Sequence, residues 1–258
     1  MSPFLPQEIL DLIVDHLHDE RTTLGVCCLV SSSWIPRARR HLFFRIEFSP
    51  ESPIELWIKA FPDPSTSPAH HARVLSLSGA TVDTAGTNAL AWVRTFYNVV
   101  DLRISAVQWT PGGVSLVPFH GLFPTLTSFS IDRSYIPPSG LIDLICSLPL
   151  LKNLELRLLP IQNTTLTHER NTPATFPELT GTLYLVGKVQ PVAYELLGLP
   201  NCLRFTKIEL RCHVNEAHLT RDLVLKCSDT LESLSVSYAS TSVFPSVYTV
   251  AQYLTVAH

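Results

Sequence analysis

A short apolar segment of the form L-x-x-L-x-L recurs at nearly even intervals along most of this 258-residue chain. Successive central residues of these segments are 27, 27, 25, 29, 25 and 26 positions apart, which is a period typical of stacked repeats. In order, the central residues are Leu75, Leu102, Phe129, Leu154, Leu183, Ile208 and Leu234. Because alternate side chains of a strand face the same side, this spacing predicts seven similar strands that share one core.

The segments NALAWVRTFYN, GLIDLICSLP and VNEAHLTRDLVLKC lie between these strands and have the periodicity of helices. The alternating pattern resembles the leucine-rich repeat, which implies an α/β solenoid with a curved parallel sheet over residues 71–258. The asparagine that this family carries five residues after each centre is missing, and we therefore expect irregular curvature. The residues in its place are Ala80, Val107, Ser134, Leu159, Lys188, His213 and Ala239.

Residues 1–46 have a different character. In LPQEILDLIVDHL the apolar residues form two overlapping helical stripes, which leaves one narrow stripe for Glu8, Asp11 and Asp15. We expect a second helix from about residue 24 to 30, and the serines of SSSWIPRARR offer an N-cap for a third helix that carries Trp34. Three helices this short cannot enclose their own apolar surface, which predicts cover by another protein.

The residues that lead to this prediction also carry a resemblance. LPQEIL, Leu17 at the end of the first helix, Leu24, CLVSSSW and RARRHLF together resemble the three-helix F-box over residues 4–44, and CLVSSSWIPRARRHLF resembles F-box proteins of fungi. The resemblance implies that this module binds a Skp-type adaptor, which in turn holds the cullin and RING subunits of a ubiquitin ligase. The candidate adaptor-binding residues are Leu5, Pro6, Ile9, Leu10, Ile13, Leu17, Leu24, Val30 and Trp34.

A structural alternative is that these residues form ordinary core of a larger N-terminal helical layer. The basic group Arg37, Arg39, Arg40 and His41 is expected to solvate the end of the third helix, where positive charge complements the helix dipole. A nuclear-import signal is the weaker interpretation of that group.

Residues 47–70 connect the two parts. FFRIEF alternates like a strand, with Phe44, Ile46 and Phe48 inward, and Ile46 lies 29 residues before Leu75, so this strand is predicted to cap the sheet. SPIELWIKAF then predicts a short outer helix and PDPSTSPAHH a proline-stiffened loop, which fixes the module to the repeats. At the other end, we interpret the apolar VFPSVYTVAQYLTVAH as a helix that caps poorly or as the end of a chain shorter than its relatives.

The residues that flank the centres are predicted to face the concave surface. Their side chains are small at both ends of the sheet and large, charged or aromatic in the middle, as expected for a binding hot spot. The alternative is a solvated face whose opposite charges, such as Asp132 and Arg157, pair across strands. The insertion IQNTTLTHERNTPATF is either a rim contact or a plain loop. The candidate target-binding residues are Arg103, Asp132, Glu155, Arg157, Tyr184, Glu209 and Arg211.

Composition and motifs exclude several classes of function. The 19 Lys and Arg against 22 Asp and Glu give a charge of -3, which disfavours nucleic acid as a partner. We expect no membrane span and no secretory signal, and therefore a cytoplasmic or nuclear protein with reduced cysteines. No G-x-S-x-G, phosphate-loop or H-E-x-x-H motif occurs, so we expect no enzyme and no cofactor. Cys202, Cys212, His213 and His218 match no common zinc spacing.

These observations favour a non-catalytic substrate receptor of an SCF-type ubiquitin ligase, which binds a Skp-type adaptor through the F-box and a target protein through the repeats. Two alternatives remain open. One is a leucine-rich-repeat regulator of a small GTPase, since solenoids host many functions. The other is an F-box protein that binds the adaptor but acts outside ubiquitination.

Overall fold

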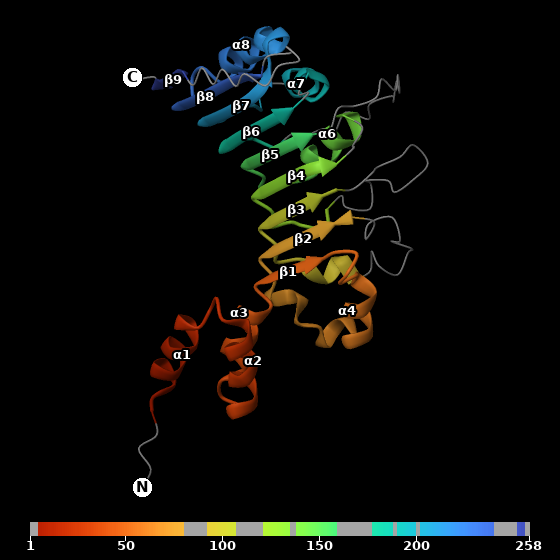
Figure 1. The fold of residues 1–258 in the computed structure, drawn as a ribbon, viewed down its shortest axis with the longest axis vertical. Helices are drawn as coiled ribbons and strands as arrows, with labels where there is room; N and C mark the ends of the chain where they lie inside the picture. The colour runs from red at the N-terminus through yellow and green to blue at the C-terminus, as the bar shows by residue number, and fades with distance from the viewer. Residues whose placement is uncertain are drawn as a thin grey trace.

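The structure is a computed structural model, and it describes residues 5–79, 92–106, 121–134, 138–158, 177–187, 190–199, 202–239 and 252–255. These residues form an elongated α/β chain with one sheet whose nine strands follow one another in chain order (Figure 1). Eight strands are parallel, and the ninth runs antiparallel to the eighth. None of the described helices is long and apolar enough to cross a membrane.

The strands are β1 Arg45–Phe48, β2 Val74–Ser78, β3 Asp101–Ser105, β4 Ser128–Ser134, β5 Asn153–Leu158, β6 Thr182–Gly187, β7 Lys207–His213, β8 Ser233–Ala239 and β9 Gln252–Thr255. Their register confirms the predicted alignment: Ile46 pairs with Leu75, and each predicted centre pairs with the next as far as Leu234. A shift by one residue would turn every buried side chain to the opposite face, so the hydrophobic alternation fixes this register.

The centres from Leu75 to Ile208 are buried, as are the residues two positions further along each of these strands, such as Ile104 and Leu185. They form one continuous hydrophobic core with residues of the helices that follow the strands. Figure 1 shows these helices together on one side of the sheet. The opposite side, which we call the open face, carries the alternate side chains.

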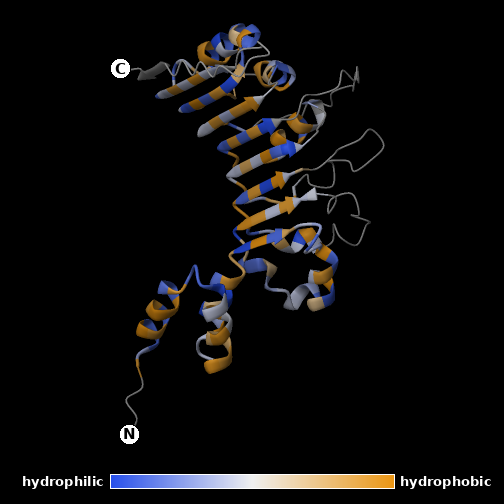
Figure 2. Cartoon of the chain, viewed as in Figure 1, coloured by the Kyte–Doolittle hydropathy of each residue, from blue (hydrophilic) through white to orange (hydrophobic). Residues whose placement is uncertain are grey.

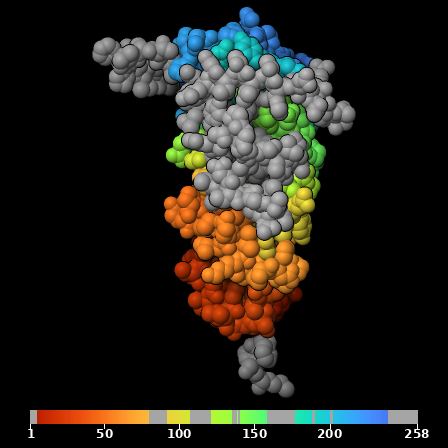
Figure 3. Space-filling view, turned by 90° about the vertical axis from the view of Figure 1, so that its right-hand side faces the viewer, coloured from red at the N-terminus to blue at the C-terminus, as the bar shows by residue number. Residues whose placement is uncertain are grey.

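The helices before the sheet are α1 Gln7–His16, α2 Arg21–Val30 and α3 Ile35–Leu42. Those that follow β1 are α4 Ile54–Ala60, the 3-10 turns η1 Pro64–Thr66, η2 Pro68–His71 and η4 Arg94–Phe96, α6 Pro138–Cys146, α7 Gln190–Leu197, η6 Val214–Glu216 and α8 Ala217–Lys226. Figure 3 shows α1 to α3, in red, at one end of the molecule and the last helix and strands, in blue, at the other.

Several predicted elements are corrected. α2 begins at Arg21, three residues before its predicted start. α3 follows Trp34 directly without a side-chain cap, because the Ser31 hydroxyl is engaged in the preceding turn, where it accepts from the Ser33 amide. Phe44 is 45% exposed and not inward, since Phe43 takes the place against the core and packs on Trp57 with ring centroids 5.8 Å apart.

At the C-terminal end, residues 252–255 form β9 and not a helix. Antiparallel pairing with β8 gives the edge of the sheet a partner for its backbone groups, which a helix would not provide. The insertion at 161–176, the start of NALAWVRTFYN, and Ala80, Val107, Leu159 and Lys188 lie outside the described residues.

The three-helix module is joined to the sheet by an aromatic cluster. Trp57 of α4 lies 6.0 Å from Phe48 and 5.7 Å from Phe96, measured between ring centroids, and Phe43 at the end of α3 packs against it. Aromatic pairs of this kind add to the stability gained from burial alone. The end of α3 is therefore packed into the first layer of the sheet.

Candidate interaction surfaces

Large apolar side chains on α1 and α2 are exposed. Leu29 of α2 is 87% exposed and Leu12 of α1 56%, and hydrophobic residues occupy much of both helices in Figure 2. Single exposed apolar residues are common, but several at helical spacing on two neighbouring helices are typical of a surface that binds another molecule. The exposed apolar residues of the module, which we call the apolar surface, are Leu5, Ile9, Leu12, Ile13, Val26, Leu29 and Val30.

The module has a small core of its own. Its fully or nearly fully buried residues are Val14, Leu24, Cys27 and Ala38, against which Leu17, Cys28, Trp34 and Leu42 pack in part. Four buried residues are few for a segment of this size, and the apolar surface does not take part in the core.

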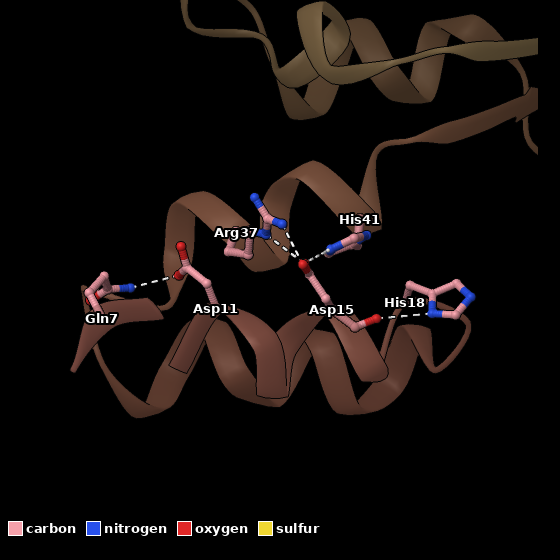
Figure 4. A network of polar contacts seen from close by, with 6 residues as sticks. All are labelled: Gln7, Asp11, Asp15, His18, Arg37 and His41. Atoms are coloured by element: carbon pink, nitrogen blue, oxygen red, sulfur yellow. Dashed lines mark hydrogen bonds and ion pairs between the residues drawn. The ribbon is translucent and has the colours of Figure 1, made fainter. Parts of the chain in front are cut away.

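Polar contacts decide which side of α1 faces the rest of the module. Asp15 accepts hydrogen bonds from Nε and Nη2 of Arg37, and its Oδ1 lies 2.7 Å from Nε2 of His41 (Figure 4). Near the start of the helix, Gln7 Nε2 donates to Asp11 Oδ1 at 2.7 Å. α1 thus turns Asp15 toward α3 and Val14 toward the core, while Ile9, Leu12 and Ile13 point to solvent.

The electrostatics of this contact favour the ionised carboxylate. The hydrogen bonds from Arg37, followed by that from His41, hold the pKa of Asp15 well below its usual range. The same contact raises the pKa of Arg37. Arg37 and His41, which were expected only to solvate the end of α3, therefore hold α1 in place.

The predicted adaptor-binding residues fall into three groups. Leu5, Pro6, Ile9, Ile13 and Val30 are exposed, and Leu10, Leu17 and Trp34 are half-buried. Leu24 was predicted to need cover from another protein, but its side chain is fully buried within the module, because α2 packs it into the core with Val14 and Ala38. It therefore needs no cover from a second chain.

Sequence reasoning missed Leu12, Val26 and Leu29 on the apolar surface. Leu12 lies three residues after Ile9, and Leu29 lies three residues after Val26, so each extends an exposed stripe at helical spacing. That spacing was visible in the sequence. What was missing was the direction in which each helix faces.

The predicted target-binding residues lie together on the open face. Glu155, Tyr184 and Glu209 are register partners on β5, β6 and β7. Two residues further along each strand is a second row of register partners. It runs from Asp132 on β4 through Arg157 and Val186 to Arg211 on β7. The three arginines of the set, Arg103, Arg157 and Arg211, are exposed, and Asp132, Glu155, Tyr184 and Glu209 are half-buried.

Charges on this face pair mostly within strands. Arg103 Nη2 lies 2.7 Å from Asp101 Oδ2, and Arg157 Nε lies 2.8 Å from Glu155 Oε1. The cross-strand pair of Asp132 with Arg157, which the alternative of a solvated face would have, is not formed among the described residues. Asp132 pairs instead with Arg133, which has a φ of 47° and lies at the register shift between Asp132 and Ser134. Cation–π contacts do cross strands, with the Arg157 Cζ 5.1 Å and the Arg211 Cζ 5.9 Å from the centroid of the Tyr184 ring.

No model of a known protein family matches this chain, and no curated protein matches it. The assignment of a function therefore depends on the two surfaces themselves.

Metal chemistry finds no support in the part of the chain that the structure describes, where no three His, Cys, Asp or Glu side chains gather in a possible metal site. Cys202 and Cys212 are buried, and burial raises the pKa of both thiols, which disfavours the thiolate form that binds metals.

Proposed function

We propose that this chain is the substrate-receptor subunit of an SCF-type ubiquitin ligase. In this proposal residues 1–46 are an F-box that binds a Skp-type adaptor, and the sheet with its helices is an irregular leucine-rich-repeat solenoid whose open face binds a target protein. The apolar surface is the observation that carries the proposal, since α1 and α2 present six large apolar side chains, and Leu5 just before α1 a seventh, that no part of the described chain covers.

The direction of α1 supports the adaptor-binding role. α1 turns Val14 toward the core of the module and Asp15 toward α3. A helix that only completed this core would need no second apolar stripe, but Ile9, Leu12 and Ile13 form one that faces solvent. Burial of such side chains against a partner removes apolar area from water and stabilises the complex.

The reaction itself belongs to other subunits in this proposal. The chain contributes proximity, because a bound target is held near the conjugating enzyme at an effective concentration of about millimolar. The packing of Phe43 on Trp57 favours this role, because it makes the path from α3 to the sheet short and ordered.

Co-purification with a Skp-type adaptor tests the adaptor-binding half. The wild-type chain should recover the adaptor, and the double variant Leu5→Ala with Pro6→Ala should recover much less, because the loss of interface anchors is expected to reduce the binding free energy by about 2 kcal/mol. Leu225→Ala is the matched control, since Leu225 is an equally large and exposed leucine on α8. Equal recovery of adaptor by the wild type and the double variant would contradict the proposal.

A further inference from the structure

The charges of the open face are balanced in pairs at almost every position. On strands β3 to β7 Arg103 pairs with Asp101, Arg133 with Asp132, Arg157 with Glu155 and Lys207 with Glu209, at 2.6 to 3.0 Å. Arg211 is the one arginine or lysine of these strands that has no ion pair among the described residues. Within the described residues, strands β3 to β7 therefore carry one positive charge more than they pair.

This unmatched charge is held in a defined position. The Arg211 guanidinium, which comes from β7, and the Arg157 guanidinium, which comes from β5, both lie against the ring of Tyr184 on the strand between them. Cation–π contacts attract each guanidinium to the ring and reduce its freedom before any ligand arrives. A ligand at this point therefore meets ordered donors and loses less entropy on binding.

The surroundings allow a polypeptide to approach these donors. The positions of the same two rows toward the ends of the sheet are serines, whose short side chains leave the middle of the face accessible. These residues are Ser76, Ser78, Ser105, Ser130, Ser235 and Ser237. An extended segment that crosses the strands therefore meets its bulkiest and most polar contacts near Tyr184.

We infer that Arg211, with Tyr184 and Arg157 beside it, binds the carboxylate of one Asp or Glu side chain in an extended segment of a protein partner. This inference rests on the proposed function only in taking that partner to be the target. The planar fork of a guanidinium matches the two oxygens of a carboxylate, and one unmatched cation fits one anion.

A group with two negative charges fits this site less well. Glu155 and Glu209 occupy the positions on either side of Tyr184 in its own row, and they remain close to any anion bound there. Their repulsion grows with the charge of the ligand, so a carboxylate is favoured over a phosphate.

An array of random decapeptides tests the inference, with the central residue fixed as Glu, Gln or phosphoserine. The labelled full-length chain should bind the Glu pool about fivefold more strongly than the Gln pool, as expected for one exposed charge pair. In Arg211→Gln this ratio should fall to about one. Arg94→Gln is the matched control, because Arg94 is also exposed but lies on η4, and it should keep the preference.

Equal binding of the Glu and Gln pools, a Glu preference that survives Arg211→Gln, or a preference for phosphoserine alone would each overturn the inference. Thermal unfolding of each variant confirms that the chain is folded before binding is measured. Adaptor recovery is measured on the same preparations, and its failure would overturn the proposed function without changing the result of the peptide array.

Discussion

Arg37 holds Asp15 by two nitrogen donors across a separation of 22 residues, and this contact joins α3 to α1. His41 adds a third contact to the same carboxylate from the next turn of α3. α1 contributes one fully buried apolar residue, Val14, to the core of the module. The position of the first helix therefore depends on charge as well as on apolar packing.

The first prediction concerns Asp15→Asn. An amide does not accept the two charge-assisted bonds from Arg37, so the variant should loosen α1 and lower the free energy of unfolding of the module by about 1 kcal/mol, a modest value because the pair is partly exposed. Hydrogen exchange of the α1 amides at neutral pH measures this change. Asp19→Asn is the control, since Asp19 is far more exposed and its ion pair is with the neighbouring His18. Equal protection in both variants would contradict the role of Asp15.

The same contact predicts a dependence on acid. The pKa of Asp15 is depressed in the folded chain, so its contribution to stability is complete above the unfolded value of about 3.9 and declines as the pH falls toward the folded value. α1 amides should therefore exchange faster relative to those of α2 when the pH is lowered from about 6 to about 3. In Asp15→Asn this extra acid sensitivity should be absent, and its persistence would assign the effect to another group.

The third prediction concerns the apolar surface beyond the motif residues. Leu29→Asp should weaken binding of a Skp-type adaptor by about 30-fold, because it places a charge at an interface position worth about 2 kcal/mol. Leu29 is 87% exposed in the free chain, so the thermal stability of the isolated protein should barely change. Titration of adaptor against each variant measures the affinity, with Leu225→Asp as the control. Unchanged affinity of Leu29→Asp would place the adaptor elsewhere.

Two glycines give a matched pair of opposite predictions. A Cβ at Gly181 would collide with Asn153 Oδ1 and lie 2.8 Å from the backbone oxygen of Lys152, so Gly181→Ala should destabilise the chain by about 1 to 3 kcal/mol. A Cβ at Gly25, inside α2, meets nothing within 4 Å, so Gly25→Ala should stabilise the chain by about 0.5 to 1 kcal/mol. Urea unfolding measures both, and effects of the same sign would contradict the packing described for Gly181.

The last prediction concerns the connection between two neighbouring outer helices. Lys226 Nζ at the end of α8 donates to the backbone oxygen of Leu197, the last residue of α7, at 2.5 Å, and to that of Leu199, two residues later, at 2.6 Å. Lys226→Met should lower the free energy of unfolding by about 1 to 3 kcal/mol, because it leaves these carbonyls without their charged donor. Arg221→Met is the control, since Arg221 is exposed on the same helix and pairs with the neighbouring Asp222. A similar loss of stability in both variants would show that the loss does not come from the hydrogen bonds of Lys226 to Leu197 and Leu199.

The sequence alone predicted the parallel strands, their number from Leu75 onward and their register. Every centre from Ile46 to Leu234 pairs as expected, because strand register depends on a local alternation that is written into each segment. The same alternation placed Arg157, Tyr184 and Arg211 on one face. It did not reveal which charges pair. Asp101 binds Arg103 and Glu155 binds Arg157 within their own strands, and Arg211 has no ion pair among the described residues.

What only the tertiary structure decided is the direction in which the helices face. α1 carries apolar residues around most of its circumference, so its periodicity fits several orientations equally well. The choice among them comes from Arg37 and His41, which are distant in sequence and bind Asp15 only once α3 has docked. Leu24 became core and Leu29 became surface for the same reason, because burial is a property of packed partners and not of the residue alone.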